Sequence, residues 1–182
     1  MKVLIIIPAY NEQENIINTV SKVLDYKTEC DFQLDYVVIN DGSKDNTYDI
    51  CRKNNIRCVN LIQNLGIGGA VQTGYKLANM QDYDIAIQFD GDGQHDINSL
   101  KSLIAPIVNG TADFTVGSRF IGDGVSFQST AMRRFGIKIL SFTLKLFAKV
   151  NISDCTSGYR AASREVLKIL ADDYPIDYPE PE

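Results

Sequence analysis

The chain has little of what a zinc protein or a membrane-spanning protein requires. It has a single histidine, His95, and its four cysteines form no C-x-x-C pair, so a zinc site is not expected. No apolar run approaches the roughly 20 residues of a membrane-spanning helix. No signal peptide precedes the cysteines, so we expect reduced thiols in a cytoplasmic protein. The cysteines are Cys30, Cys51, Cys58 and Cys155.

Basic residues are also in short supply. Lys and Arg number 18 against 23 Asp and Glu, and the resulting net charge of -5 argues against nonspecific binding of nucleic acid. With 182 residues, 45% of them hydrophobic, we expect one domain over residues 1–182 with a sizeable core. Residues 172–182 carry acids and prolines that disfavour a regular element, and we expect the natural protein to continue beyond them.

Short apolar runs alternate with segments of helical spacing in the first half of the chain. Because the runs are continuous, we expect strands that are covered on both faces, in a mainly parallel sheet with helices on either side. This is a Rossmann-like α/β fold, in which ligands bind at the carboxyl ends of the strands. The predicted strands are 3–7, 36–39, 56–61 and 85–89, and the predicted helices are 12–24, 45–51 and 69–80.

The most informative motif is Asp90-Gly91-Asp92, which follows the apolar run 85–89. Hard divalent cations prefer oxygen ligands and bridge phosphate oxygens, so two carboxylates at a strand end suit a metal ion bound with a nucleotide diphosphate. Gly91 and Gly93 have no Cβ, which lets a substrate approach the main chain closely. The alternative is a turn of solvated acids, because Asp and Gly are common at strand ends.

A polar segment, residues 8–12, follows the first predicted strand. Tyr10 offers a flat face for a nucleobase, and Glu12 can accept hydrogen bonds from the base or the ribose. The alternative is a helix entry, with Asn11 as the cap and Glu14 at the third helical position.

A second polar segment, residues 40–47, follows the second predicted strand. Asp41 is placed to accept a hydrogen bond from an imide or amide proton of a base. The alternative is a turn and a helix cap, but Ser43 or Asp45 could provide that cap. Asp41 is then left without an obvious structural task.

The glycine-rich segment 64–70 follows the third predicted strand and opens a helix, so its backbone amides could face an anionic group. We include Gly68 of this segment among the donor-binding candidates. A dinucleotide-binding fingerprint would lie directly after the first strand, and here Val71 stands at its last glycine position. An EF-hand starting at Asp90 is excluded, since His95 and Lys101 stand where Gly and Glu are required.

Together these segments resemble a family 2 glycosyltransferase with the GT-A fold, of the polyprenyl-phosphate type related to dolichol-phosphate mannose synthase. The resemblance covers nearly the whole chain, and several ordered motifs are more specific than any one of them. One departure is Asn40, where the family often has a second Asp; we expect this change to tune base binding, since the base contact is expected from Asp41. The matching segments are 7–12, 40–47, 64–70, 90–95, 117–120 and 157–160.

The resemblance implies where the donor and a metal ion would bind. His95 is either an outer-shell partner of the metal site or a cap of the following helix. Mg²⁺ or Mn²⁺ would be held against the diphosphate by Asp90, Asp92 and Gln94. The nucleoside pocket would be lined by Pro8, Tyr10, Glu12, Ile39 and Asp41.

Breaking the bond between sugar C1 and phosphate develops charge on the leaving group, which a divalent ion and cationic side chains stabilise. Arg119 and Arg133 are the candidate cations, because guanidinium groups match phosphate oxygens; Arg134 is the rival of Arg133. A surface ion pair is the alternative role for Arg119.

Asp154 lies in a segment that resembles the family's acceptor-side loop. It is the candidate base if the acceptor is a sugar hydroxyl, because a carboxylate must then take the proton. If the acceptor is a lipid phosphate, the nucleophile is already an anion and Asp154 would orient it. The alternative is a turn or a helix cap. The family's direct displacement implies inversion at C1.

Residues 125–153 carry five basic side chains and no acid. With apolar residues at helical spacing, this stretch could contact a membrane surface through residues 129–150, near a polyprenyl phosphate. The alternative is an amphipathic core helix with a solvated basic face.

The leading hypothesis is a metal-dependent inverting glycosyltransferase that uses a UDP- or GDP-sugar. We expect polyprenyl phosphate, or a saccharide of a cell-envelope polysaccharide, as the acceptor. A nucleotidyltransferase would open with a glycine-rich basic loop, which residues 8–12 are not. A noncatalytic module that binds nucleotide sugars is the remaining alternative. We expect the protein in the cytoplasm, peripherally at the inner face of the membrane.

Overall fold

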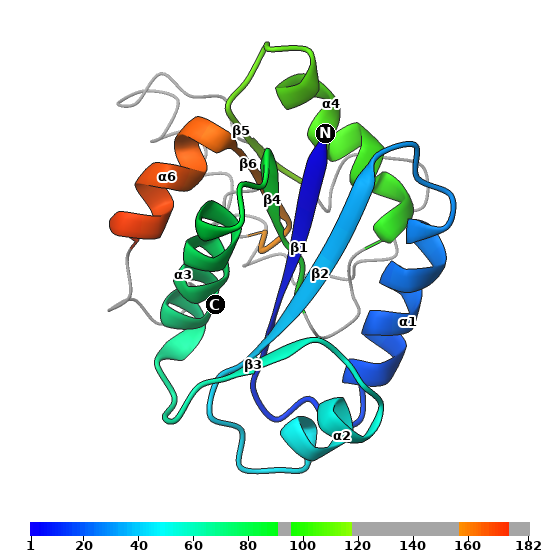
Figure 1. The fold of residues 1–182 in the computed structure, drawn as a ribbon, viewed down its shortest axis with the longest axis vertical. Coiled ribbons are helices and arrows are strands. Elements are labelled where there is room, and N and C mark those ends of the chain that lie inside the picture. The colour runs from blue at the N-terminus through cyan, green and yellow to red at the C-terminus, as the bar shows by residue number, and fades with distance from the viewer. Residues whose placement is uncertain (91–95, 118–156, 175–182) are drawn as a thin grey trace, which may run out of the picture.

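The structure is a computed structural model that describes residues 1–90, 96–117 and 157–174. Figure 1 shows a central sheet between two layers of helices. The strands are β1 (Lys2–Ala9), β2 (Gln33–Asn40), β3 (Cys58–Asn60), β4 (Ile85–Gln88), β5 (Phe114–Val116) and β6 (Arg160–Ser163). The helices are α1 (Ile16–Lys27), α2 (Thr47–Lys53), α3 (Gly66–Met80), the 3₁₀ turn η1 (Ile97–Ser99), α4 (Leu100–Val108) and α6 (Arg164–Asp172).

The sheet confirms the predicted parallel arrangement and adds an edge that the sequence did not predict. The strand order is β3-β2-β1-β4-β6-β5, and β1 pairs in parallel with both β2 and β4. β6 is antiparallel to β4 and to β5. β5 has three residues and β6 has four, and both lack the continuous apolar runs that predicted the parallel strands.

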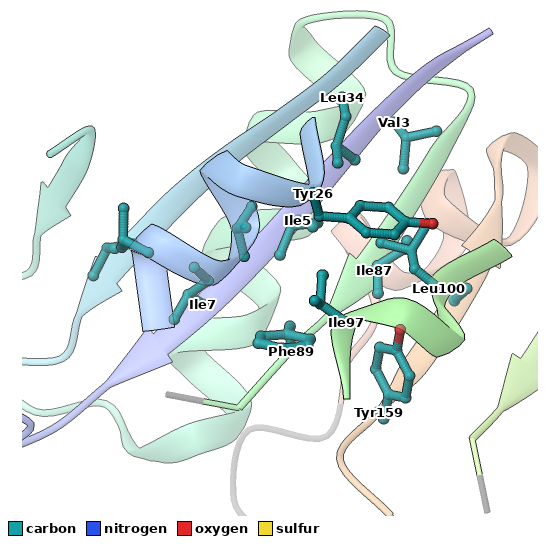
Figure 2. Packing of buried hydrophobic residues seen from close by; sticks show 14 of the residues in the cluster. Val3, Ile5, Ile7, Tyr26, Leu34, Ile87, Phe89, Ile97, Leu100 and Tyr159 are labelled. Atoms are coloured by element: carbon teal, nitrogen blue, oxygen red, sulfur yellow. The ribbon is translucent and has the colours of Figure 1, made fainter. Parts of the chain in front are cut away.

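Each face of the sheet carries its own core. Side chains alternate along β1, so Val3, Ile5 and Ile7 pack with the apolar residues of α1 and α4, while Leu4 and Ile6 pack with those of α3 and α6. Figure 2 shows the first of these cores, where the β1 side chains lie on the same side of the sheet as residues of α1 and α4. Both faces are covered, as the continuous apolar runs predicted.

Several boundaries differ from the predicted ones. α1 begins at Ile16 instead of residue 12, because the Glu12 carbonyl accepts the backbone N–H groups of Asn15 and Ile16 in a turn that precedes the helix. The proposed cap Asn11 is therefore wrong, and its φ of 58° is left-handed. α3 begins at Gly66, three residues before the predicted start. In the described part of the chain, no helix is long and apolar enough to cross a membrane.

Candidate active site

A cavity of about 450 Å³ opens at the carboxyl ends of the parallel strands β1, β2 and β4. This is the end at which open α/β sheets bind ligands, because the chain leaves neighbouring strands in different directions there. The predicted residues Pro8, Tyr10, Glu12, Asp41 and Asp90 all contribute to its lining. The other lining residues are Ala9, Asn64, Gly66, Ile67 and Ala70.

One wall is built from the loops that follow β1 and β2, which hold each other through reciprocal hydrogen bonds. The backbone N–H of Asn11 donates to Ser43 Oγ at 2.9 Å, and Asn11 Oδ1 accepts the backbone N–H of Lys44 at 2.9 Å. The backbone N–H of Gln13 donates to Asp45 Oδ2 at 3.1 Å. The two loops are thus joined by side chains that cap backbone groups, and the cavity wall is built before any ligand arrives.

Glu12, which lines the cavity, is joined to the second loop through the buried Thr47. The backbone N–H of Glu12 donates to Thr47 Oγ1 at 2.8 Å, and Thr47 Oγ1 donates to Asp45 Oδ1 at 2.5 Å. Glu12 Oε2 accepts the side-chain amide of Asn15 at 2.9 Å. The Glu12 side chain is half-buried, so it can still accept a hydrogen bond from a nucleoside.

Asp41 has a structural task, contrary to the prediction. Its Oδ1 accepts the backbone N–H of Leu65 at 2.7 Å and so holds the loop between β3 and α3. Burial raises the pKa of Asp41, while hydrogen bonds from the backbone of Leu65 and Gly66 oppose the rise. The loops meet closely, since a Cβ on Gly42 (φ 63°) would lie 2.7 Å from Asn64 N. A carboxylate has two oxygens, so Asp41 can hold this loop and still line the cavity.

Asn40, the departure from the family pattern, is buried, and both polar atoms of its side chain are hydrogen-bonded. Its Nδ2 donates to Asn60 Oδ1 at 2.5 Å, and its Oδ1 accepts Ser43 Oγ at 2.5 Å. If residue 40 were Asp, two hydrogen-bond acceptors would face each other, the carboxylate and Asn60 Oδ1, unless the Asn60 amide were turned to present its NH₂ group. Asn40 therefore joins β2 to β3 behind the cavity wall. Its effect on base binding stays a prediction.

The remaining donor-binding candidates differ in their access to the cavity. Tyr10 is 42% exposed, so its ring is available for a flat ligand. Pro8 is buried in β1 and still touches the cavity. Ile39 is completely buried in the core beneath α3, and Gly68 is buried in the first turn of that helix. Neither is among the described residues that line the cavity, so we place both beneath its surface.

The opposite wall carries Asp90, just beyond β4. Gln88 Nε2 donates to Asp90 Oδ1 at 3.3 Å. A Cβ on Gly158 would lie 2.1 Å from Asp90 Oδ2, so the backbone before β6 lies directly against this carboxylate. The sequence analysis did not single out Gln88, which lies two residues before Asp90, or this role of Gly158, which depends on the pairing of β4 with β6.

Asp90 fits the chemistry of a divalent-cation site, because it supplies a hard carboxylate oxygen at the cavity surface. Within residues 1–90, 96–117 and 157–174, no three His, Cys, Asp or Glu side chains gather in a way that could hold a metal. A cation at Asp90 would therefore need ligands other than such a described cluster, for example phosphate oxygens of a substrate.

Six of the predicted site residues lie outside the described residues. Asp96 caps η1 by accepting the backbone N–H of Asn98 at 3.0 Å, so the capping task considered for His95 belongs to its neighbour. His95 itself also lies outside the described part, as does the basic stretch 129–150. The six are Gly91, Asp92, Gln94, Arg119, Arg133 and Asp154.

A second cavity of about 530 Å³ lies at the opposite end of the sheet. Lys2, Gln33 and Asp84 line it, together with Met1, Cys30, Asp31 and Phe32. It contains none of the predicted site residues, and it lies at the amino ends of the strands. Its greater volume therefore does not make it the better candidate.

Solved structures resemble this fold. The crystal structure of glucosyl-3-phosphoglycerate synthase from Mycobacterium tuberculosis, in complex with Mn²⁺, UDP and glucosyl-3-phosphoglycerate, matches with a TM-score of 0.66 and 20% identity, over 91% of this chain and 57% of that one. Mannosyl-3-phosphoglycerate synthase from Rubrobacter xylanophilus matches with a TM-score of 0.69 and 14% identity, over 91% of this chain and 54% of that one. These matches confirm the predicted GT-A fold.

The sequence of the chain is similar to those of characterised relatives and matches a family model. UDP-N-acetylglucosamine--dolichyl-phosphate N-acetylglucosaminyltransferase of Methanococcus voltae is 34% identical over 186 residues, 92% of this chain and 72% of that protein. Undecaprenyl-phosphate mannosyltransferase of Micrococcus luteus is 29% identical over 179 residues, 93% of this chain and 70% of that protein. The model described as glycosyl transferase family 2 matches residues 4–170. As its motifs predicted, the chain belongs to glycosyl transferase family 2.

Proposed function

We propose that this chain is the catalytic domain of a metal-dependent, inverting glycosyltransferase that moves a sugar from a nucleotide diphosphate to a polyprenyl phosphate. The observation that carries the proposal is the cavity at the carboxyl ends of β1, β2 and β4. It brings Tyr10, Glu12 and Asp41, three groups suited to a nucleoside, into one space with Asp90, a group suited to a metal-bound diphosphate.

The nucleoside would bind along the wall made by the first two loops. The exposed ring of Tyr10 offers a stacking face, and Asp41 offers a carboxylate oxygen to an imide proton. Uracil carries such a proton and so does guanine, so the carboxylate alone fits either base. The structurally similar synthase from M. tuberculosis was crystallised with UDP, and the relative from M. voltae is named for UDP-N-acetylglucosamine. A UDP-sugar is therefore the donor that we favour over a GDP-sugar.

The diphosphate would lie between this wall and Asp90. Asp90, with Asp92 and Gln94, would hold Mg²⁺ or Mn²⁺, and the bound ion would neutralise charge on the leaving diphosphate. Arg119 and Arg133 would bind phosphate oxygens of the donor or the acceptor. The bond from C1 to the diphosphate oxygen breaks as the acceptor oxygen bonds to the opposite face of C1, which inverts the configuration.

The relatives favour a lipid-linked acceptor. Two of them are named for dolichyl phosphate and undecaprenyl phosphate. A phosphate oxygen needs no general base, so Asp154 would orient the acceptor or its arginine partner; with a saccharide hydroxyl, Asp154 would take the proton. Contact with the inner face of a membrane through residues 129–150 would bring the domain to such a lipid.

The test is calorimetric titration of UDP- and GDP-sugars, with and without Mn²⁺, against the wild-type chain and Asp92→Asn. We expect one UDP-sugar to bind in a metal-dependent way and the variant to lose that dependence. Binding of every donor with equal affinity, or none with any metal, would contradict the proposal.

A second variant separates the donor from the acceptor side. Asp154→Asn should bind the donor as the wild type does, but transfer the sugar slowly to short-chain polyprenyl phosphate. Equal loss of donor affinity in Asp92→Asn and Asp154→Asn would sink this assignment of roles. Transfer to a saccharide but not to the lipid would replace the proposed acceptor.

A further inference from the structure

Gln88 is a polar residue in a buried position that an apolar side chain would ordinarily occupy. It is 3% exposed and lies in β4, where it pairs with Ile6 of β1 and with Arg160 of β6. The three residues before it in β4 are the apolar Ile85, Ala86 and Ile87. Burial of a side-chain amide is unfavourable unless its hydrogen bonds are replaced.

Within the described residues, only one of the two polar atoms of the Gln88 side chain has a hydrogen bond that replaces its hydration. Its Nε2 donates to Asp90 Oδ1 at 3.3 Å. Its Oε1 is buried and has no hydrogen-bond partner among the described groups. A buried acceptor without a donor destabilises the folded state, so an apolar side chain of the same shape should serve the core at least as well. The contact with Asp90 is what this residue contributes.

A second residue restricts the same carboxylate from another direction. A Cβ on Gly158 would lie 2.1 Å from Asp90 Oδ2 and 2.5 Å from Oδ1. Any other residue at this position would displace the Asp90 side chain, or the backbone that leads into β6. Gly158 is thus required by close approach to the carboxylate, and its position follows from the antiparallel pairing of β6 with β4.

We propose that Gln88 and Gly158 are positioning residues that set the orientation of the Asp90 carboxylate for a divalent cation. The inference rests on the proposed function, in which Asp90 is a metal ligand. A donor on Oδ1 limits rotation of the carboxylate, as outer-shell partners do in metal sites. The donor is a neutral amide, so it orients Asp90 without competing with the cation for its negative charge.

The test replaces Gln88 by Met, which keeps the length of the side chain and removes both the donor and the unsatisfied acceptor. We expect the affinity for Mn²⁺, measured by titration in the presence of UDP, to fall about tenfold. The affinity for UDP without metal should stay within about twofold of the wild type, and the melting temperature of the metal-free chain should be unchanged or raised.

Gln33→Met is the matched control, because Gln33 Nε2 also donates to an aspartate two residues along its strand, Asp35 Oδ2 at 2.8 Å. That pair lies at the far end of β2 from the cavity. We expect no change in Mn²⁺ affinity. Gly158→Ala should weaken Mn²⁺ binding as Gln88→Met does, since it moves the same carboxylate.

The outcomes distinguish this inference from the proposed function. If the wild type binds Mn²⁺ with UDP and Gln88→Met binds it equally well, Gln88 does not position Asp90 and the inference is overturned. If Gln88→Met lowers the melting temperature and weakens metal-free UDP binding to the same extent as Mn²⁺ binding, its role is structural and the inference is again overturned. If the wild type itself binds no Mn²⁺, the proposed function fails, and the inference with it.

Discussion

The two walls of the cavity are held in different ways. On the nucleoside wall, side chains of the first two loops cap backbone groups at 2.8–3.1 Å, and Asp41 joins the third loop at 2.7 Å. On the metal wall, the described contacts of Asp90 include the Gln88 side-chain amide at 3.3 Å and the backbone of Gly158.

The difference indicates how the two halves of a donor would be recognised. A nucleobase is recognised by hydrogen-bond donors and acceptors in fixed positions. Because this wall is already ordered, little conformational entropy is lost when the base binds. A cation is coordinated by ligands from both the protein and the diphosphate. The Asp90 carboxylate must therefore be held in the right orientation and must keep its negative charge. The following variants test this division, in order of decreasing expected effect.

The largest effect is expected for Asp90→Asn. It removes a charged ligand of the proposed cation, so transfer from a UDP-sugar at saturating Mn²⁺ should fall about 100-fold or more. UDP affinity without metal should change little, because the nucleoside wall is intact. Asp96→Asn is the control, since Asp96 caps η1 and an asparagine can cap equally well. Equal activity of Asp90→Asn and wild type would remove Asp90 from the metal site.

Asp41→Asn should weaken donor binding by tens of fold while the fold is preserved. The amide oxygen can still accept the Leu65 N–H, but an NH₂ group then faces the base where an acceptor is needed. Calorimetry with the UDP-sugar measures this loss. Asp35→Asn, at the far end of β2, is the control and should bind the donor normally.

The same variant carries a pH prediction. The pKa of Asp41 is raised by burial, so its contribution to stability is present when it is protonated and is lost as the pH rises through its folded pKa. Asparagine does not titrate. The free energy of unfolding of Asp41→Asn relative to the wild type should therefore increase between about pH 3.5 and neutral pH. A difference that is independent of pH would contradict the raised pKa of Asp41.

Tyr10→Ala should lower the affinity for the donor about fivefold, the size expected for loss of an aromatic stacking contact. Because Tyr10 is 42% exposed, the melting temperature should hardly change. Tyr10→Phe keeps the ring and should bind the donor as the wild type does. If Tyr10→Phe loses as much affinity as Tyr10→Ala, the hydroxyl and not the ring makes the contact.

The smallest effect on donor affinity is expected for Asp45→Asn, because Asp45 acts on the cavity only through the loops. Its Oδ2 accepts the Gln13 N–H, which an asparagine NH₂ group would face, and the loss should be about 1 kcal/mol in the free energy of unfolding.

This loss of stability should also depend on pH. Burial alone would raise the pKa of Asp45, but hydrogen bonds from Thr47 and Gln13 lower it. The ionised Asp45 stabilises the folded state above its ordinary pKa, and this contribution is lost as the pH falls. The difference in the free energy of unfolding between the wild type and Asp45→Asn should therefore shrink below about pH 4.

The sequence predicted the parallel half of the fold well and the antiparallel edge not at all. The runs at β1, β2 and β4 are apolar on both faces, which only a covered strand tolerates, and this pattern is visible in a single chain. The antiparallel strands β5 and β6 are short, and β6 joins β4 from more than seventy residues further along the chain. Pairing across such a distance leaves no periodic signal.

The donor-binding candidates show the same limit. Tyr10, Glu12 and Asp41 were found because they follow strands, Pro8 was implied by the family resemblance, and the structure brings all four to one cavity. Ile39 was expected in the lining and is instead buried beneath it, because the strand's alternation turns its side chain toward α3. Asp41 was expected to have no structural task, and the Leu65 amide that it holds is 24 positions away.

By itself, the sequence determined the family, the parallel core and the end of the sheet at which ligands bind, since local hydrophobic patterns and ordered motifs carry that information. Only the tertiary structure decided which groups face each other across the cavity. The contact of Asp90 with Gly158 depends on the register between β4 and β6, and the contact of Asp41 with Leu65 depends on how two loops meet. Register and loop contact are set by packing of the whole chain, because neighbours in space need not be neighbours in sequence.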